Sequence, residues 1–311
     1  MGIVYLVLSK ISAILKMITM KGCGQLASGA LGSTVINLIR TLGCLLISVV
    51  VCAFSGFSDI GDMGMLLAII SGIANAILLF SWVLAARNAS LCTVEIFCMI
   101  GGIALPLILT PIFIPGDTVG VTEWVAALLL FPAAYLYSGK RTNESSPVKA
   151  LPFLILSMIG NAGCVITQKL FTVYSAGAAQ DFNLYGYFFS ALTLGVILLI
   201  TVLFGHVSSS GKENNPAAAK ADAELGVLTD RRKLVRVGIL ITVAVVMLYL
   251  SSLLSTLAAA KLDSAFFFAM SYAIGMPLTV LADIVVFKEK LTVRAILATA
   301  IVLASVILFS L

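Results

Sequence analysis

Long apolar segments alternate with short polar ones along the whole chain. Each apolar segment holds about 20 residues, enough for a helix to cross the roughly 30 Å hydrocarbon core of a bilayer. Their approximate limits are 2–20, 33–54, 64–86, 91–114, 121–138, 149–172, 182–204, 234–259, 264–287 and 291–311. Because only a helix satisfies its own backbone hydrogen bonds in lipid, every segment is expected to be helical. The pattern predicts an all-α membrane protein with ten transmembrane helices.

The two halves of the chain resemble each other in sequence. Residues 6–21 align with residues 154–169 at a spacing of 148, and seven of these sixteen positions are identical. Further along, Pro106 aligns with Pro277 at a spacing of 171. Two aligned blocks with matched prolines indicate an internal repeat.

The repeat divides the chain into two units of five helices each. We predict a first repeat at 1–138, a linker loop at 139–148 and a second repeat at 149–311. The spacing grows from 148 to 171 because a polar, flexible loop at 205–233 lengthens the second repeat.

Basic loop residues gather on one face of the predicted bundle. They are Lys21, Arg87, Lys140, Arg141, Lys212, Lys220, Arg231, Arg232, Lys233, Lys288 and Lys290. The positive-inside rule places this face in the cytoplasm and both termini outside. Since each repeat has five spans, the two repeats are predicted to be inverted relative to each other, as is common in secondary transporters.

The end of the second repeat carries a recognisable pattern. An apolar span ends in the charged turn KEKLT, residues 288–292, and a last span rich in small residues follows. This resembles the closing pattern of EamA-like domains in the drug/metabolite transporter superfamily. The first repeat departs from it, with GDTVG at 116–120 in place of the turn that contains Glu289. The resemblance implies a ten-helix transporter and names no substrate.

Composition indicates that the bilayer is the main solvent. The chain is 61% hydrophobic and 11% charged, whereas soluble domains carry about a quarter charged residues. The net charge of +5 lies mostly in loops, and no basic patch with interleaved aromatics indicates nucleic-acid binding. Metalloprotease, hydrolase and P-loop motifs do not occur in the sequence. We therefore expect no enzyme activity, no cofactor and no metal.

Charges inside the apolar spans are candidates for function, because burying a charge is costly unless it pairs or meets water. Lys10 is the deepest of them, and we predict that it binds an acidic group of a substrate beside Glu95. Neutral polar residues in the spans could complete this cavity or bond a neighbouring helix. They are Asn75, Trp82, Asn161, Gln168, Tyr249 and Tyr272. From these we assign Asn161, Tyr249 and Tyr272 to the substrate site.

Three further charges, Lys16, Arg40 and Asp283, lie toward the predicted cytoplasmic side. We interpret them as gating contacts or interhelical ion pairs, and Glu95 and Asp283 could serve in either role.

Two prolines and several small residues bear on helix geometry. Pro106 and Pro277 are predicted to kink their helices, because a mid-helix proline removes one hydrogen bond. Paired kinks at the midplane suit a rocking transporter. Gly72 and the pair Gly101 and Gly102 are predicted to permit close helix packing.

These features predict a secondary transporter that moves a small metabolite by alternating access. The lysines favour an anionic or zwitterionic substrate, such as an amino acid, an organic acid or a sugar derivative. A proton-coupled exporter of amphipathic cations is the alternative, and a non-transporting membrane scaffold is the alternative of another class. We expect a multi-pass protein of the bacterial inner membrane, as a monomer or homodimer. Its partners would be the solute, the bilayer and a coupled proton or counter-substrate.

Overall fold

The computed structural model describes residues 1–26, 30–89, 91–114, 120–137, 147–209, 231–286, 288 and 292–309. The helices are α1 (Gly2–Leu26), α2 (Ala30–Ser55), α3 (Gly61–Asn88), α4 (Leu91–Phe113), α5 (Val121–Tyr137), α6 (Pro147–Tyr174), α7 (Ala179–Ser209), α9 (Arg231–Ala259), α10 (Ser264–Val285) and α11 (Val293–Phe309). Seven of them, α1–α4, α6, α7 and α9, are long and apolar enough to cross a membrane. The described residues therefore form the all-α fold of a multi-pass integral membrane protein.

The three remaining helices carry shorter apolar stretches. These are Val121–Ala133 in α5, Phe266–Ala282 in α10 and Ile296–Ser305 in α11. Each stretch coincides with one of the spans predicted from sequence, and the crossing of the membrane by these three helices stays a prediction.

Two of the loops predicted from sequence are partly helical, because the neighbouring helices extend into them. Helix α7 continues to Ser209 and α9 begins at Arg231, so both helices extend into the segment predicted as the 205–233 loop. Helix α6 begins at Pro147, within the segment predicted as the 139–148 linker. Polar residues extend these helices because an end that projects beyond the hydrocarbon core can remain helical in water.

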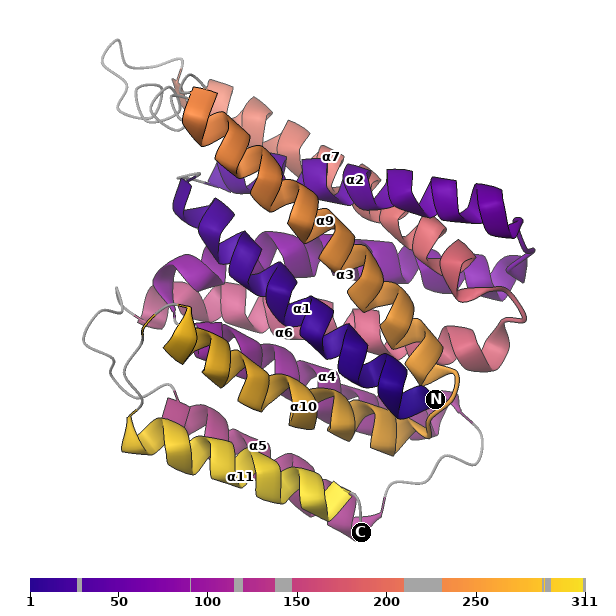
Figure 1. Cartoon of the computed structure of the whole chain (residues 1–311), viewed down its shortest axis with the longest axis vertical. Coiled ribbons are helices and arrows are strands. Elements are labelled where there is room, and N and C mark those ends of the chain that lie inside the picture. The colour runs from indigo at the N-terminus through magenta and orange to yellow at the C-terminus, as the bar shows by residue number, and fades with distance from the viewer. Residues whose placement is uncertain are drawn as a thin grey trace.

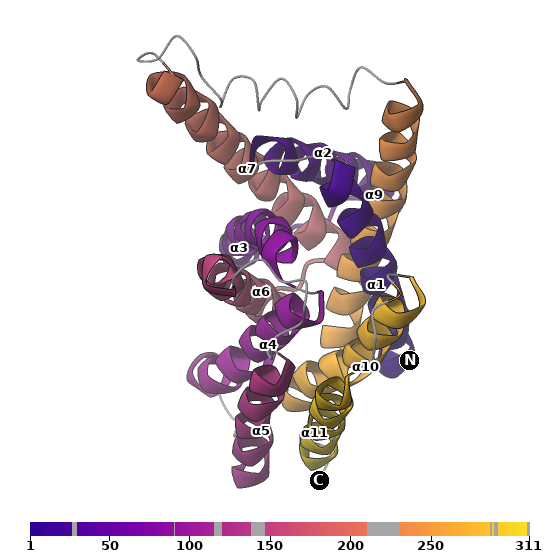
Figure 2. The same cartoon turned by 90° about the vertical axis from the view of Figure 1, so that its left-hand side faces the viewer.

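The helices form two packed groups. In one group α6 packs on α3 and α4, and in the other α1 packs on α9 and α10. Figure 2 shows α3, α6, α4 and α5 in one layer and α9, α1, α10 and α11 in the other. Helices α2 and α7 pack together at the top of Figure 1, and α5 and α11 pack together at the bottom. Each group thus combines helices from both halves of the chain.

The helix pairings recur with the two halves exchanged. The contact of α3 with α6 has its counterpart in the contact of α9 with α1. In the same way, α4 with α6 corresponds to α10 with α1, and α3 with α7 corresponds to α9 with α2. The central helices are therefore held by contacts between the halves rather than within them.

Small residues let α3 approach its neighbours closely. A Cβ atom at Gly160 of α6 would lie 2.7 Å from the backbone nitrogen of Leu78. A Cβ atom at Gly72 of α3 would lie 2.7 Å from the carbonyl oxygen of Gly186 in α7. Neither position can hold a larger residue unless the helices move apart, so the close packing predicted at Gly72 is confirmed.

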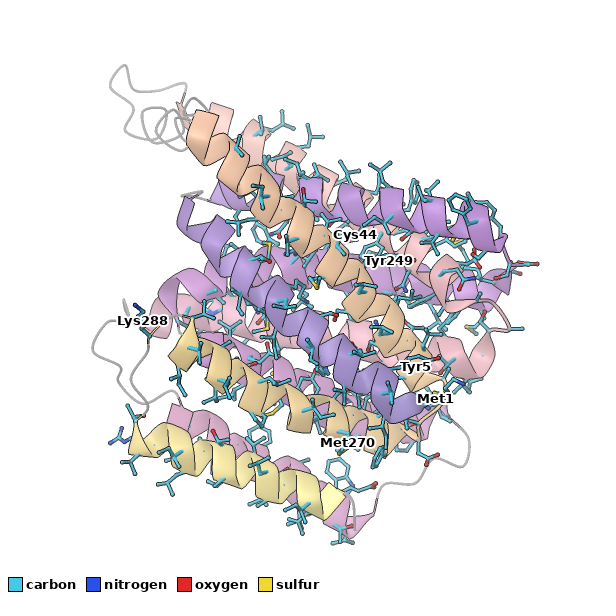
Figure 3. The ribbon with its side chains drawn as sticks, in the orientation of Figure 1. Met1, Tyr5, Cys44, Tyr249, Met270 and Lys288 are labelled. Carbon is cyan, nitrogen blue, oxygen red and sulfur yellow. The ribbon has the colours of Figure 1, made fainter. Side chains whose placement is uncertain are left out.

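Both termini lie on one side of the molecule. Figure 1 shows the start of α1 and the end of α11 on the right, while α7 ends and α9 begins on the left. Figure 3 labels Met1 on the first side and Lys288 on the other. We refer to the two sides as the terminus side and the Lys288 side.

Candidate functional site

A cavity of about 180 Å³ lies between the two helix groups. Its lining comes from α3, α4 and α6 of one group, from α1, α9 and α10 of the other, and from α2 and α7. An engineered protein cavity of roughly 150 Å³ admits a molecule the size of benzene, so this space suits a small metabolite. We call the lining residues from residues 1–114 the first-half wall and those from residues 147–286 the second-half wall.

Helix α1 shows how the sequence places charge on the cavity. Its exposed apolar side chains recur every three or four residues, which puts them on one helix face. They are Val4, Leu8, Ile11 and Leu15. The lining residues follow the same spacing on another face. They are Ser9, Lys10, Ala13, Lys16, Met17 and Met20. Helix α1 therefore presents an apolar face to lipid and a partly charged face to the cavity.

The first-half wall holds three cations and one carboxylate. Lys10, Lys16, Arg40 and Glu95 all line the cavity. Glu95 interacts electrostatically with both lysines, and Lys16 also interacts with Arg40. Since like charges repel in a low dielectric, Lys16 and Arg40 favour a negative group between them. When all four are ionised, the wall carries two positive charges in excess.

Lys10 lies beside an ordered pair of polar side chains. Its Nζ atom is 4.9 Å from the centre of the Tyr272 ring, within the range of a cation–π interaction. Asn161 Nδ2 donates to the Tyr272 hydroxyl and, at 2.7 Å, to the carbonyl oxygen of Cys98. Gly102 makes room for this arrangement, because a Cβ atom there would collide with the Tyr272 hydroxyl. These contacts join α1, α4, α6 and α10 at the cavity.

Among the described lining residues, the second-half wall carries no charge, and most of its side chains are polar. Ser252 Oγ donates to Asn183 Oδ1 at 2.7 Å, and Ser255 Oγ donates to Gln168 Oε1 at 3.1 Å. Asn183 is 4% exposed, and its Nδ2 group has no hydrogen-bond partner among the described residues. A buried polar group without a partner is rare in proteins, so this donor favours a bound molecule with an acceptor.

Six of the residues predicted from sequence meet on this cavity. They are Lys10, Lys16, Arg40, Glu95, Asn161 and Tyr272. Four of the predicted substrate residues, Lys10, Glu95, Asn161 and Tyr272, thus share one site with the predicted gating residues Lys16 and Arg40. Asn75, Trp82 and Gln168 line the same space.

Tyr249 does not line the cavity. It packs against Tyr187 with ring centres 6.4 Å apart, in a cluster that includes Cys44 and Leu248. Figure 3 shows Tyr249 and Cys44 close together, where α9 crosses α2. Leu248, one residue earlier on α9, lines the cavity instead. A direct contact of Tyr249 with substrate therefore has no support from this arrangement.

The other predicted site residues lie in α4 and α10. Pro106 and Pro277 occupy the interiors of α4 and α10, two helices that contact each other. Neither proline lines the cavity. Asp283 belongs to α10, and its side chain lies outside the part of the chain that the structure describes.

Sequence reasoning missed part of the second-half wall. Ser251, Ser252 and Ser255 line the cavity together with Asn183. The serines follow one another at a helical spacing within an apolar helix, which is a pattern that marks one face. Asn183 lies in the second turn of α7. From sequence alone, a polar residue near a helix end can equally be one that faces water.

Comparison with known proteins identifies the fold alone. No protein-family model matches the chain, and no curated protein matches it. A solved structure described only as "Crystal structure of protein" matches with a TM-score of 0.61 and 13% sequence identity. The match covers 99% of this chain and 94% of the other, so the similarity extends over the whole helix arrangement.

Proposed function

We propose that this protein is a secondary transporter that carries a small anionic or zwitterionic metabolite. The observation that carries the proposal is the cavity between the two helix groups, with Lys10, Lys16 and Arg40 on its wall. Cations inside a membrane protein are costly unless water or an anion meets them. A bound substrate anion would stabilise all three.

An inverted repeat of two five-helix units is part of the proposal. Its support is that the helix contacts recur when the halves are exchanged. For example, the contact of α3 with α6 corresponds to the contact of α9 with α1. The shared side of the two termini agrees with ten crossings. The KEKLT turn at 288–292 supports membership of the drug/metabolite transporter superfamily, although residues 289–291 lie outside the described part of the chain.

Alternating access would come from rocking the α3, α4 and α6 group against the α1, α9 and α10 group. The cavity lies between these groups, so their relative rotation would open it to one side and then the other. Pro106 and Pro277 lie in α4 and α10, which touch each other across the boundary between the groups. Kinks at these positions would lie where the groups move.

The sign of the wall charge favours one of the two candidate substrate classes. An exporter of cations needs an acidic site, yet Glu95 is the single carboxylate among the described lining residues, and it interacts with two lysines. The scaffold alternative gives no reason for three cations around an internal space. The charges therefore favour anion transport.

Flux into proteoliposomes tests the proposal. We expect saturable uptake of labelled small carboxylates such as glycerate, and a large loss of that uptake in Lys16→Met. Lys261→Met is the matched control, because Lys261 is an exposed lysine between α9 and α10 and lies outside the cavity. Saturable uptake of organic cations alone would establish the alternative substrate class. No uptake of either class would support a scaffold.

A further inference from the structure

Three of the four charged residues in the described lining, Lys16, Arg40 and Glu95, lie toward one end of the cavity, whereas Lys10, in the third turn of α1, lies nearer the other end. Glu95 lies in the second turn of α4, which begins on the Lys288 side, and Arg40 lies in the half of α2 nearer the same side. Asn183 lies in the second turn of α7, which begins on the terminus side. Ser255 lies near the end of α9 on that side. A molecule that fills the cavity therefore meets three charged groups toward one end, and amide and hydroxyl groups toward the other, with Lys10 nearer to the second end.

The neutral end is built from amide and hydroxyl pairs. The side-chain oxygen of Asn183 accepts from Ser252, and that of Gln168 accepts from Ser255. Both amide oxygens are thus engaged, and the Asn183 amide nitrogen, on a side chain that is 4% exposed, has no partner among the described residues. Asn183 lines this end of the cavity, so its side chain places an unpaired, buried amide donor beside serine hydroxyls that can donate or accept.

Hydroxyl groups match this end better than the other groups of small metabolites. A hydroxyl can accept from the Asn183 amide and donate in return, whereas an alkyl chain would leave the amide unpaired. A site built for hydrogen bonding discriminates strongly against an analogue that lacks the bonding group. An ammonium group would need a carboxylate, and the cavity's carboxylate, Glu95, belongs to the charged end among the described lining residues.

We infer that the substrate is a small polyhydroxylated anion, with an acidic group near Lys16 and Arg40 and hydroxyl groups near Asn183 and Ser252. This inference rests on the proposed function and narrows its substrate class. The cavity of about 180 Å³ fits roughly six to nine non-hydrogen atoms by comparison with cavities that admit benzene. Hydroxy acids of three or four carbons have this size, and the smallest phosphate esters, with about ten non-hydrogen atoms, slightly exceed it. The acidic group is a carboxylate or a phosphate, since lysine and arginine bind both.

A matched set of four-carbon ligands tests the inference on the purified protein. Threonate carries hydroxyls and a carboxylate, butyrate the carboxylate alone and erythritol the hydroxyls alone. By titration we expect threonate to bind about tenfold or more tightly than butyrate, and erythritol to show no saturable binding. Comparison of glycerate with glycerol 3-phosphate then distinguishes a carboxylate from a phosphate. Equal affinity for threonate and butyrate would overturn the inference while leaving anion transport intact. Absence of binding by every anion would overturn both.

Two substitutions test whether the neutral end of the cavity is what distinguishes threonate from butyrate. Asn183→Leu keeps the branched shape and the number of side-chain heavy atoms and removes the amide, and Ser252→Ala removes a single hydroxyl. Each should reduce threonate affinity by about threefold to tenfold and leave butyrate affinity unchanged. Retained butyrate binding shows that the variant is folded. Gln180→Leu, one turn earlier on α7 and outside the cavity, is the control. If Asn183→Leu does not fold, Ser252→Ala decides alone. An equal loss for both ligands, or no loss for either, would contradict the inference.

Discussion

The two halves of the chain supply different chemistry to one cavity. Every charged side chain among the described lining residues belongs to the first-half wall: Lys10, Lys16, Arg40 and Glu95. The second-half wall is uncharged, and its polar members are Asn161, Gln168, Asn183, Tyr187, Ser251, Ser252, Ser255 and Tyr272. Helices in equivalent positions of the two groups can thus carry unrelated side chains toward the same space. The helix scaffold sets where a residue lies, and each half sets its own chemistry.

Lysines of α1 and α6 show the same contrast at single positions. At the spacing of 148, Lys16 aligns with Cys164, whereas Lys21 aligns with another lysine, Lys169. Lys169 Nζ donates to the carbonyl oxygens of Ala259 at 3.1 Å and Leu262 at 2.8 Å, which ties α6 to the end of α9. The lysine that both halves share is thus structural in the second half. Lys16, which has a cysteine as its counterpart in the second half, lines the cavity instead.

The largest effect is expected from moving the charge of Lys16 between the halves. Lys16→Cys should weaken anion binding about 100-fold, because losing a buried charge partner costs roughly 2–5 kcal/mol. Adding Cys164→Lys returns a lysine to the same cavity from the opposite wall, and should restore affinity to within about tenfold. Titration with threonate or butyrate measures both steps. A full loss that Cys164→Lys does not reverse would mean that the position of Lys16, rather than the charge of the cavity, controls binding.

Removal of the shared lysine should instead affect stability. Lys169→Met loses two charge-assisted hydrogen bonds to backbone carbonyls, and we expect a loss of about 2 kcal/mol of unfolding free energy. Thermal unfolding in detergent should show a midpoint lower by several degrees, with anion affinity changed less than about threefold. A loss of anion affinity at unchanged stability would place Lys169 in the binding site, and would contradict the assignment of a structural role to Lys169 and a binding role to Lys16.

Lys10→Met should have an intermediate effect on binding. It removes a cation that lies over the Tyr272 ring and interacts with Glu95, and we expect anion affinity to fall about tenfold. Adding Glu95→Gln restores the net charge of the wall and should recover most of this loss. If Glu95→Gln gives no recovery in titrations of the double variant, Lys10 contacts the ligand directly and does not act through the summed charge.

The smallest effect is expected from the tyrosine of the second-half wall. Tyr272→Phe keeps the ring near Lys10 and loses only the hydrogen bond from Asn161. Anion affinity should change less than about threefold, because a neutral hydrogen bond contributes about 1 kcal/mol or less here. Tyr272→Leu removes the ring and should approach the effect of Lys10→Met. A larger loss in Tyr272→Phe than in Tyr272→Leu would rule out the cation–π contact as the relevant one.

Hydropathy was sufficient to locate the helices and the first-half wall. Lipid tolerates a charge only where it faces protein or water, so Lys10, Lys16, Arg40 and Glu95 could be assigned to the interior from their positions in apolar spans. The structure places all four on one cavity. A buried charge thus indicates which way its side chain points.

The second-half wall was harder to predict because neutral side chains are tolerated on either face of a helix. The sequence favours Tyr249 as a site residue, yet its neighbour Leu248 lines the cavity, because adjacent residues point about 100° apart around a helix. Asn183 carries no charge that would mark it as buried. The pairing of Asn183 with Ser252 depends on contact between α7 and α9, which the sequence does not contain as a pattern.

The most direct test of the account is the sign of the ligand charge. Butyrate and butylammonium share a four-carbon chain and differ in the charge of the head group. Titration of the purified wild-type protein with each should give saturable binding of butyrate, lost in Lys16→Met and kept in Lys261→Met, and no saturable binding of butylammonium. Saturable binding of butylammonium without butyrate would contradict the central claim that the cations of the first half select an anion.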